Sequence, residues 1–285
     1  QINPLSHVEL LQMNSPNTQK DTPSPPALAL HFRKFGENGP DLVVLHGLFG
    51  FGKNWRSFAR SFENDFQVWT LDARNHGESP HAETMSYLEM AEDVICFLDK
   101  NELKTVILLG HSMGGKTAMQ VALRLPNRIS ALIAVDIAPV RYENQQQQLG
   151  LIEAMQELHF TAEMSRAEIK KKLAEKIPEK RLLSFLMTNL TLENGRFRWR
   201  IGLGQISAGM QNLLKFTEIK SVFSGPTQFI GGENSDYIKT EYHSLIRKSF
   251  PLSRITMLKN CGHWLHVNSR EHSKKMLTNF CSKMV

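Results

Sequence analysis

The segment "LLGHSMGGKT" at residues 108–117 carries two possible chemistries in overlapping registers. The pattern G-x-x-x-x-G-K-[ST], which wraps a nucleotide phosphate, runs from Gly110 to Thr117. The pattern G-x-S-x-G, which presents a serine nucleophile at a strand-to-helix turn, runs from Gly110 to Gly114 with Ser112 at its centre. Both patterns need an apolar strand before the glycines and a helix after them. Other residues must therefore decide between them.

Three further features favour the serine nucleophile. The motif "HGLFG" at 46–50 follows an apolar run, and a tight turn there can direct backbone N–H groups toward a developing oxyanion. Gly114 and Gly115 open the next helix, and small residues let helix and strand approach closely. His263 follows the last predicted strand, where the general base is expected when the chain order is serine, acid, histidine. A phosphate loop explains none of these features, so Lys116 is expected to be an ordinary residue of the first helical turn.

The chemistry of the two leading residues is complementary. Ser112 is the expected nucleophile, and it needs a base to remove its proton. His263 is the expected base, which later returns the proton to the leaving group. The rivals for the base are His266, His111 and His46; we expect His111 to point away from the serine and His46 to brace the oxyanion turn.

The oxyanion hole is expected to consist of backbone N–H groups. Met113 follows the nucleophile and supplies one, and Leu48 supplies the other, with Phe49 as the alternative. The stretch "DARNHG" at 72–77 is interpreted as a hydrogen-bonded loop that supports the oxyanion turn.

Short apolar runs alternate with amphipathic helices along most of the chain, which predicts a parallel sheet covered on both faces. An alternating stretch from Ala27 to Phe35 suggests an edge strand. The other expected strands are 41–47, 66–72, 104–110, 129–136, 226–232 and 253–258, and the expected helices are about 54–62, 87–100, 114–125 and 270–284.

The alternation stops between residues 140 and 224, where only helical patterns are found. We expect this segment to be a helical cap, inserted into a core formed by residues 27–139 and 225–285. Residues 1–26 are polar and rich in proline, and they are expected to be a disordered tail or a vector-derived remnant.

Composition excludes several classes of partner. The 34 Lys and Arg and 28 Asp and Glu give a net charge of +6, but the basic cluster at 165–181 is interleaved with acids, which is typical of a solvated helix face rather than a nucleic-acid site. No apolar run is long enough to cross a membrane. The three cysteines are too scattered for a disulfide framework or a zinc site, so no metal is expected, and the chain is expected in a reducing compartment.

Several motifs together resemble one family. "HGLFG", "DARNHGESPH", "GHSMGGKTAM", "AVDIAPV", "NGRFRWR" and "GHWLH" are similar to those of the α/β-hydrolases, and specifically of the YbfF-type bacterial esterases and their mitochondrial relatives. The resemblance implies an α/β-hydrolase fold with a mostly parallel central sheet and a helical cap after strand 6. It also implies hydrolysis of acyl esters or thioesters without a cofactor, in the bacterial cytoplasm or, in a eukaryote, in the mitochondrial matrix.

Two aspartates compete for the role of the acid that orients His263. Many hydrolases of this fold place it after the strand represented by 226–232, and Asp236 lies in that loop. That loop, "GGENSDYI", departs from the look-alike sequences, whose loop generally lacks an acid. Asp136 ends the strand beside the nucleophile strand, in the shared "VDIAPV" stretch, and we choose it, with Ser235 as a possible supporting hydrogen-bond donor.

The expected substrate is a small-molecule ester or thioester with a short to medium apolar acyl chain. Large apolar side chains in the cap could line an acyl pocket or form core between cap helices: Met155, Phe160, Phe185, Leu186, Met187 and Trp199. Gln145 to Gln148 are expected at a solvated entrance. The alternative functions are a cofactor-free lyase or perhydrolase on the same fold, a non-catalytic hydrolase-fold receptor, and a phosphate-loop NTPase.

Overall fold

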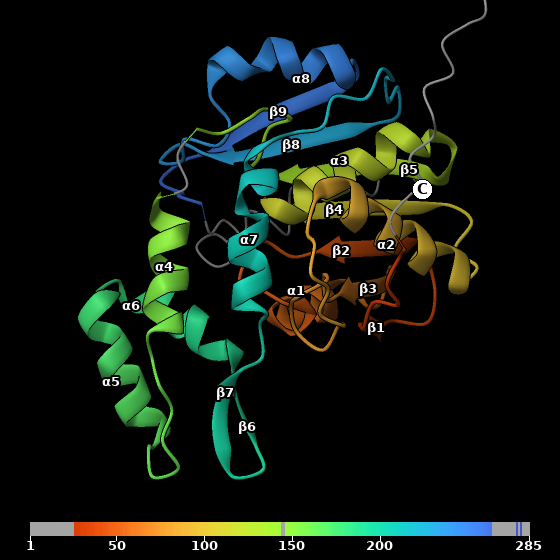
Figure 1. The fold of residues 1–285 in the computed structure, drawn as a ribbon. Coiled ribbons are helices and arrows are strands. Elements are labelled where there is room, and N and C mark those ends of the chain that lie inside the picture. Colours follow the sequence, from red (N-terminus) through yellow and green to blue (C-terminus); the bar gives the residue numbers. More distant parts are fainter. Residues whose placement is uncertain (1–25, 144–145, 264–277, 279, 281–285) are drawn as a thin grey trace, which may run out of the picture.

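The computed structural model describes residues 26–143, 146–263, 278 and 280. Its centre is a seven-stranded sheet in the order β1-β3-β2-β4-β5-β8-β9 (Figure 1). β1 pairs antiparallel with β3, and the other neighbours pair in parallel, which confirms the predicted mostly parallel sheet. The strands are β1 (Phe32–Phe35), β2 (Asp41–Leu45), β3 (Gln67–Leu71), β4 (Val106–His111), β5 (Ile129–Val135), β8 (Thr227–Gly232) and β9 (Ser253–Leu258).

The central strands are buried on both faces because successive side chains point to opposite sides of the sheet. Alternate residues such as Val43 and Leu108 join one apolar cluster, to which α2 (Tyr87–Lys100), α3 (Met113–Arg124) and α8 (His243–Ser249) contribute. Their neighbours, such as Leu109, join a second cluster with α1 (Arg56–Phe62). The sheet is therefore covered on both faces, as expected.

The predicted element boundaries need small corrections. The helix expected at 54–62 begins as a 3-10 turn, Gly52–Trp55, before α1. α8 was not predicted, and the helix expected at 270–284 falls almost wholly outside the described residues, as do residues 1–25 of the expected tail. The other 3-10 turns are Pro126–Arg128, Met187–Asn189 and Thr240–Tyr242.

The segment between β5 and β8 leaves the sheet and forms a separate lobe (Figure 1). It contains α4 (Gln146–Gln156), α5 (Arg166–Lys176), α6 (Lys180–Leu186) and α7 (Leu203–Leu214). Their apolar side chains form a third cluster, which also takes in Phe49 from the loop after β2 and Met113, the first residue of α3. This lobe follows β5, the fifth described strand, one fewer than the sixth-strand position implied by the family resemblance.

The expectation of helices alone between 140 and 224 is wrong at one place. β6 (Leu190–Glu193) and β7 (Arg196–Trp199) form an antiparallel hairpin. Asn194 and Gly195 both have positive φ, 49° and 75°, and such a two-residue turn matches the twist of a hairpin. The Asn-Gly pair was the signal that should have predicted it.

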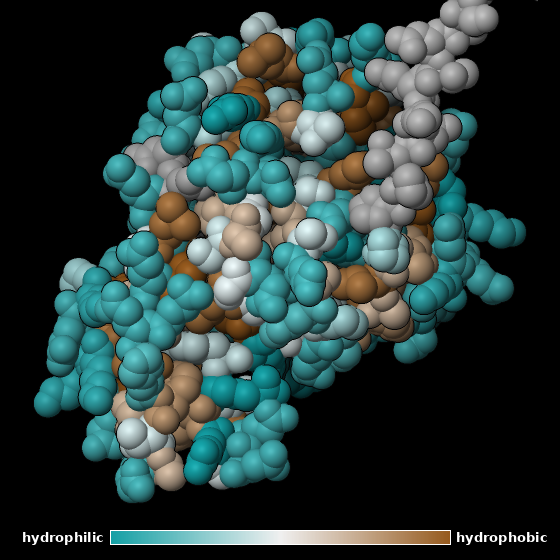
Figure 2. All heavy atoms as spheres, in the orientation of Figure 1, coloured by the Kyte–Doolittle hydropathy of each residue, from teal (hydrophilic) through white to brown (hydrophobic). Residues whose placement is uncertain are grey.

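The basic cluster at 165–181 lies on the outside of the lobe. The lysines of α5 are exposed, while Ile169 and Leu173 of the same helix are buried. Figure 2 shows this part of the surface as predominantly hydrophilic. The solvated helix face predicted from the interleaved charges is therefore present.

Candidate active site

Ser112 lies at the sharp turn between β4 and α3, with φ 52° and ψ −117°. A side chain is strained in this region of backbone space, and the turn is possible only because its neighbours are small. A Cβ on Gly110 would lie 2.2 Å from the carbonyl oxygen of Gly114, and one on Gly114 would lie 2.3 Å from that of Leu45. The elbow geometry predicted from the G-x-S-x-G pattern is thus present.

The structure brings Asp136 and His263 together. Asp136 follows β5 and is fully buried, and its Oδ2 lies 2.7 Å from Nδ1 of His263. The same carboxylate accepts hydrogen bonds from the Ser235 hydroxyl and from the backbone N–H of Gly232. These contacts hold a buried carboxylate where it can fix the tautomer of the imidazole.

Asp236, the alternative acid, lies elsewhere. Its side chain is 95% exposed, and its carboxylate lies 3.6 Å from the ammonium of Lys239. Although Asp236 directly follows Ser235, whose hydroxyl binds Asp136, its own side chain points into solvent. The geometry therefore favours Asp136 for the acid.

Two aromatic side chains flank His263. The ring of Tyr237 stacks on the imidazole with centroids 4.2 Å apart and an interplanar angle of 26°. The His111 ring lies 4.8 Å from it, and His111 Nε2 lies 2.9 Å from the carbonyl oxygen of His263. His111, which we expected to point away from Ser112, lines the same cavity as the serine and contacts the main chain of His263. His266 lies outside the described residues.

Ser112 and His263 line one cavity of about 170 Å³. Ser112 also lines a second, inner cavity of about 60 Å³, whose walls include Lys116 and Met113. A third space of about 430 Å³ leads outward between α4 and the Asp236 loop. Gln148 and Tyr237 line all three, so the cavities meet at this pair.

The "HGLFG" turn lies directly against the nucleophile. A Cβ on Gly47 would come within 3.3 Å of the Ser112 Cβ. The N–H of Phe49 donates to His76 Nε2 at 3.3 Å, so this amide is already occupied. For Leu48 and Met113, no backbone N–H acceptor is recorded among the described residues, and Met113 begins α3, where helix geometry leaves N–H groups free. The geometry favours Leu48 over Phe49 as the second oxyanion donor.

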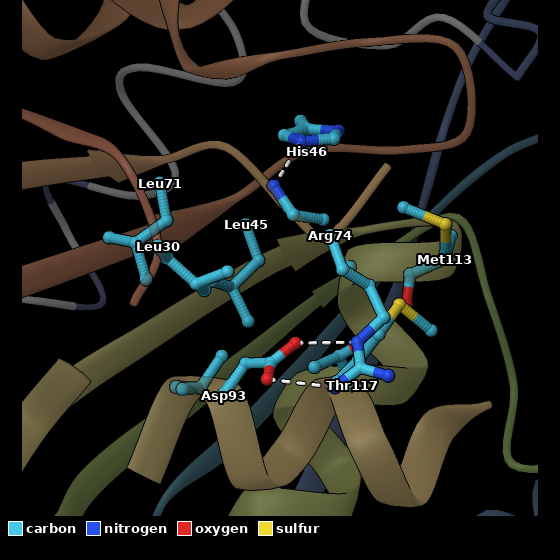
Figure 3. Close-up of a pocket in the computed structure, with 12 residues that line it drawn as sticks. Leu30, Leu45, His46, Leu71, Arg74, Asp93, Met113 and Thr117 are labelled. Atoms are coloured by element: carbon cyan, nitrogen blue, oxygen red, sulfur yellow. Dashed lines mark hydrogen bonds and ion pairs between the residues drawn. The ribbon is translucent and has the colours of Figure 1, made fainter. Parts of the chain in front are cut away.

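Two buried histidines support this turn. Burial lowers the pKa of His76 to about 3 and also lowers the pKa of His46, so both rings are neutral at pH 7. His46 Nε2 accepts a hydrogen bond from the N–H of Ala73, seen in Figure 3, while its Nδ1 lies 2.8 Å from the Gly47 carbonyl. His46 therefore braces the oxyanion turn, as expected.

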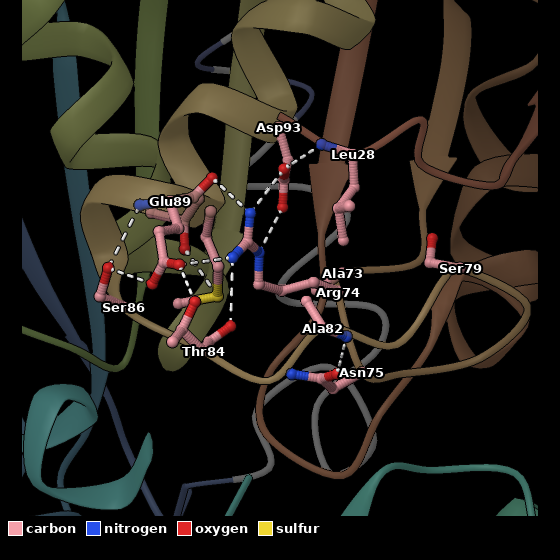
Figure 4. Close-up of polar contacts among 12 residues, drawn as sticks. Leu28, Ala73, Arg74, Asn75, Ser79, Ala82, Thr84, Ser86, Glu89 and Asp93 are labelled. Atoms are coloured by element: carbon pink, nitrogen blue, oxygen red, sulfur yellow. Dashed lines mark hydrogen bonds and ion pairs between the residues drawn. The ribbon is translucent and has the colours of Figure 1, made fainter. Parts of the chain in front are cut away.

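The loop that follows β3 is fixed by buried charges. The Arg74 guanidinium makes two hydrogen bonds to Asp93 of α2, at 2.7 and 2.9 Å, and pairs with Glu89 (Figure 4). The Asp72 carboxylate accepts from the backbone N–H groups of Gly52 and Glu78. The supporting role predicted for "DARNHG" is consistent with these contacts.

Lys116 is not an ordinary residue of a helical turn. Its side chain is fully buried, and its Nζ donates to the carbonyls of Leu214 and Lys215 at 3.0 and 3.1 Å. The rings of Tyr87 and Tyr142 lie 5.3 and 4.7 Å from the nitrogen. A lysine held in this way cannot reach out to a nucleotide phosphate, which argues against the phosphate-loop interpretation.

Of the two roles considered for the six large cap residues, pocket wall or core, the structure favours core. Met155, Leu186 and Met187 belong to the third apolar cluster, Phe160, Phe185 and Trp199 pack against it, and none of the six lines the three cavities. Sequence reasoning missed Tyr237 and the burial of Lys116. The spacing of Lys116 four residues after Ser112 could have indicated a shared helix face. Nothing in the sequence placed Tyr237 on the histidine.

The described residues were also compared with what binding a metal ion or crossing a membrane would require. Cys261 is buried in an apolar cluster, and it and Cys96 are free thiols. The described residues contain no group of three or more His, Cys, Asp or Glu side chains suited to a metal ion. Nor does the described part of the chain contain a helix long and apolar enough to span a membrane.

Comparisons with known proteins show the family to which the chain belongs. Residues 40–269 match the family described as alpha/beta hydrolase fold. The chain is 40% identical over 248 residues to the sn-1-specific diacylglycerol lipase ABHD11 of Xenopus laevis, covering 85% of this chain and 80% of that protein. It is 31% identical over 231 residues to esterase YbfF of Escherichia coli, and the match covers 80% of this chain and 88% of that protein. A solved marine microorganism esterase matches with a TM-score of 0.87 and 37% identity, covering 89% of this chain and all of that one. This chain belongs to the α/β-hydrolase family, among its esterase- and lipase-type enzymes.

Proposed function

We propose that the chain is a serine hydrolase that cleaves carboxylic esters or thioesters through Ser112, His263 and Asp136. The observation that carries the proposal is the 2.7 Å contact between buried Asp136 and His263, which lines one cavity together with Ser112. His263 takes the serine proton as the oxygen attacks the carbonyl, and then protonates the leaving alcohol or thiol. Water, activated by the same histidine, releases the acyl group from the serine.

The positions of the cavities support an assignment of the two halves of the substrate. Because His263 must protonate the leaving group, that group belongs in the cavity that His263 lines, which continues outward. The inner cavity, lined by Ser112 without His263, is left for the acyl group. Its volume of about 60 Å³ has room for roughly four water-sized atoms, which supports the short end of the proposed short to medium acyl range.

Removal of the nucleophile gives the first test. We expect Ser112→Ala to abolish both ester hydrolysis and labelling by a fluorophosphonate, with a rate loss on the order of 10⁶, because the variant lacks the proposed nucleophile. The measurement is p-nitrophenyl butanoate turnover alongside labelling and a thermal melt. A variant that keeps its fold and hydrolyses the ester at the wild-type rate contradicts the proposal.

The second test concerns the acid. We expect Asp136→Asn to lower kcat by about 10⁴, as loss of the acid does in serine proteases, because the histidine loses its tautomer and the imidazolium loses its partner. Asp236→Asn is the matched control, since that carboxylate is exposed and pairs with Lys239, and we expect it to change kcat less than tenfold. If Asp236→Asn lost most of its kcat while Asp136→Asn kept it, Asp236 would be the acid instead.

The alternatives are separated in the same assays. Fluorophosphonate labelling without turnover of any ester or thioester indicates a receptor or a different carbonyl chemistry, and magnesium-dependent ATP binding indicates an NTPase. We also propose a reducing compartment, the bacterial cytoplasm or the mitochondrial matrix, which is supported by the free thiols of Cys96 and Cys261.

A further inference from the structure

The inner cavity is unusual for a pocket assigned to an apolar acyl chain. Most of its walls are aliphatic or aromatic, including Ile137, Met210 and Leu213. Two strongly polar side chains, Lys116 and Gln148, line it as well. Burying an ammonium or an amide is costly unless its hydrogen bonds are made, so each polar atom of these two side chains needs a partner.

Lys116 reaches the cavity because of its place in α3. It lies four residues after Ser112, so both residues are on one face of the helix. Long helical side chains lean toward the helix N-terminus, and the lysine therefore covers the turn that begins at the nucleophile. Its Nζ ends against the carbonyls of Leu214 and Lys215, at the C-terminus of α7.

Two carbonyls accept hydrogen bonds from the Lys116 nitrogen, and its other neighbours are the rings of Tyr87 and Tyr142. The ammonium has three N–H groups, and no third acceptor for them is recorded among the described residues. Burial lowers the pKa of Lys116 to about 7, and in the neutral amine the remaining position is a lone pair. In one state this position donates and in the other it accepts.

The neighbouring tyrosine hydroxyls cannot fill that position. The Tyr87 hydroxyl donates to the Leu213 carbonyl at 2.9 Å. The Tyr142 hydroxyl donates to the Tyr237 carbonyl at 2.6 Å and accepts from the N–H of Ala138 at 2.8 Å.

Gln148 also has a polar atom without a hydrogen-bond partner among the described residues. Its Nε2 donates to the Tyr237 hydroxyl at 3.2 Å, but its Oε1 is buried and has no hydrogen-bond partner among the described residues. Rotating the amide by 180° would pair the oxygen with that hydroxyl and leave the nitrogen unpaired instead. Either orientation leaves one amide atom in need of a partner.

We propose that the inner cavity is a subsite for a short hydroxyacyl group, whose hydroxyl binds between Lys116 and Gln148. A hydroxyl both donates and accepts, so it satisfies the lysine in either charge state and the amide in either orientation. A ketone oxygen only accepts, and a methyl group does neither. The inference deepens the proposed function, on which it rests, by naming the class of acyl group.

The experiment compares each hydroxyacyl ester with its methyl isostere. Phenyl esters of 2-, 3- and 4-hydroxybutanoate are assayed on the wild-type protein against 2-methylbutanoate, 3-methylbutanoate and pentanoate, with spontaneous hydrolysis subtracted. We expect one hydroxy isomer to exceed its isostere by about tenfold in kcat/KM, since a site built to bind a hydroxyl leaves buried groups unpaired when the hydroxyl is missing. The 3-oxobutanoate ester, an acceptor only, is expected to fall between the two.

Variants identify the groups responsible. Lys116→Met and Gln148→Leu keep the approximate side-chain volume and remove the polar atoms. Each is expected to reduce the hydroxyl preference, to near unity in Lys116→Met, and the double variant is expected to lose little more because one hydroxyl serves both groups. Lys100→Met, which removes an exposed charge at the end of α2, is the control and is expected to keep the wild-type preference.

The outcomes distinguish the inference from the proposed function. If the wild type hydrolyses the methyl isosteres as well as or better than all three hydroxy isomers, the subsite proposal is overturned and the esterase stands. A preference that survives in Lys116→Met and Gln148→Leu also overturns it. If the wild type hydrolyses none of the esters, the proposed function fails, and the subsite fails with it. The wild-type comparison needs no variant, so a Lys116→Met protein that does not fold leaves the test intact.

Discussion

The Lys116 side chain is fully buried but has only two hydrogen-bond acceptors within the described part of the chain, and this affects how the stability of the protein depends on pH. Burial lowers its pKa in the folded protein from 10.5 to about 7. Between these values the unfolded chain binds a proton that the folded protein releases. The free energy of unfolding therefore rises with pH across this window, and below pH 7 the full cost of burying the charge remains.

We expect the difference in unfolding free energy between wild type and Lys116→Met to shift by about 2 kcal/mol in favour of the wild type from pH 7 to pH 9. Urea unfolding of both proteins at the two pH values measures it. Lys100→Met should follow the wild type, because its lysine is exposed. Parallel pH dependences for wild type and Lys116→Met would show that the lysine keeps an ordinary pKa.

Single residues differed in how far the sequence could predict them. Ser112 and His263 could be predicted because their positions follow from turn chemistry and chain order. Choosing between Asp136 and Asp236 required a resemblance, since both follow buried strands. Burial of Lys116 depends on carbonyls at Leu214 and Lys215, about a hundred residues away, and no local pattern reports such a contact.

At the scale of elements, two glycines in the same chain have opposite roles. Gly150 lies inside α4, is exposed, and has nothing within 4 Å of the position a Cβ would take. Gly110 is the next-to-last residue of β4, and the same added atom would lie 2.2 Å from the backbone of Gly114. Glycine weakens the interior of a helix, so Gly150 can be replaced to advantage. Gly110 cannot be replaced, because a larger residue does not fit there.

We expect Gly150→Ala to raise the free energy of unfolding by about 0.5 to 1 kcal/mol with unchanged ester hydrolysis, since alanine favours the helix. Gly110→Ala should lower both stability and activity, because the elbow must shift. Thermal melts and butanoate turnover on the two variants test the pair. A Gly110→Ala protein as stable and active as wild type would mean that the elbow has room to spare.

The elements themselves were predictable to different degrees. Buried strands such as β4 and β5 were evident because apolar runs of this length, bounded by turn residues, have few other places in a fold. The β6–β7 hairpin was missed although Asn194 and Gly195 mark its turn, since helical patterns on both sides dominated the interpretation. α8 was missed because its seven residues bury only Ile246.

At the scale of the whole molecule, the mostly parallel sheet followed from the alternation of strands and helices, and the site followed from the ends of the strands. The cavities could not be predicted from the sequence. They lie where α4, α7 and the loop at Tyr237 meet the core, so their shape depends on packing between segments that the sequence keeps far apart. The large apolar residues of the lobe turned out to be its core, because composition does not distinguish an interior from a pocket wall.

The order of the proposed site residues along the chain also has a consequence for biosynthesis. Leu48, Ser112 and Asp136 emerge from the ribosome early, while His263 follows β9, whose pairing with β8 completes the described sheet. A nascent chain that lacks β9 would present an exposed serine without its base. Catalytic competence would then arrive only with the last pairing of a parallel sheet, a topology that folds slowly. Chains cut short by stalled translation would be inert rather than indiscriminate hydrolases.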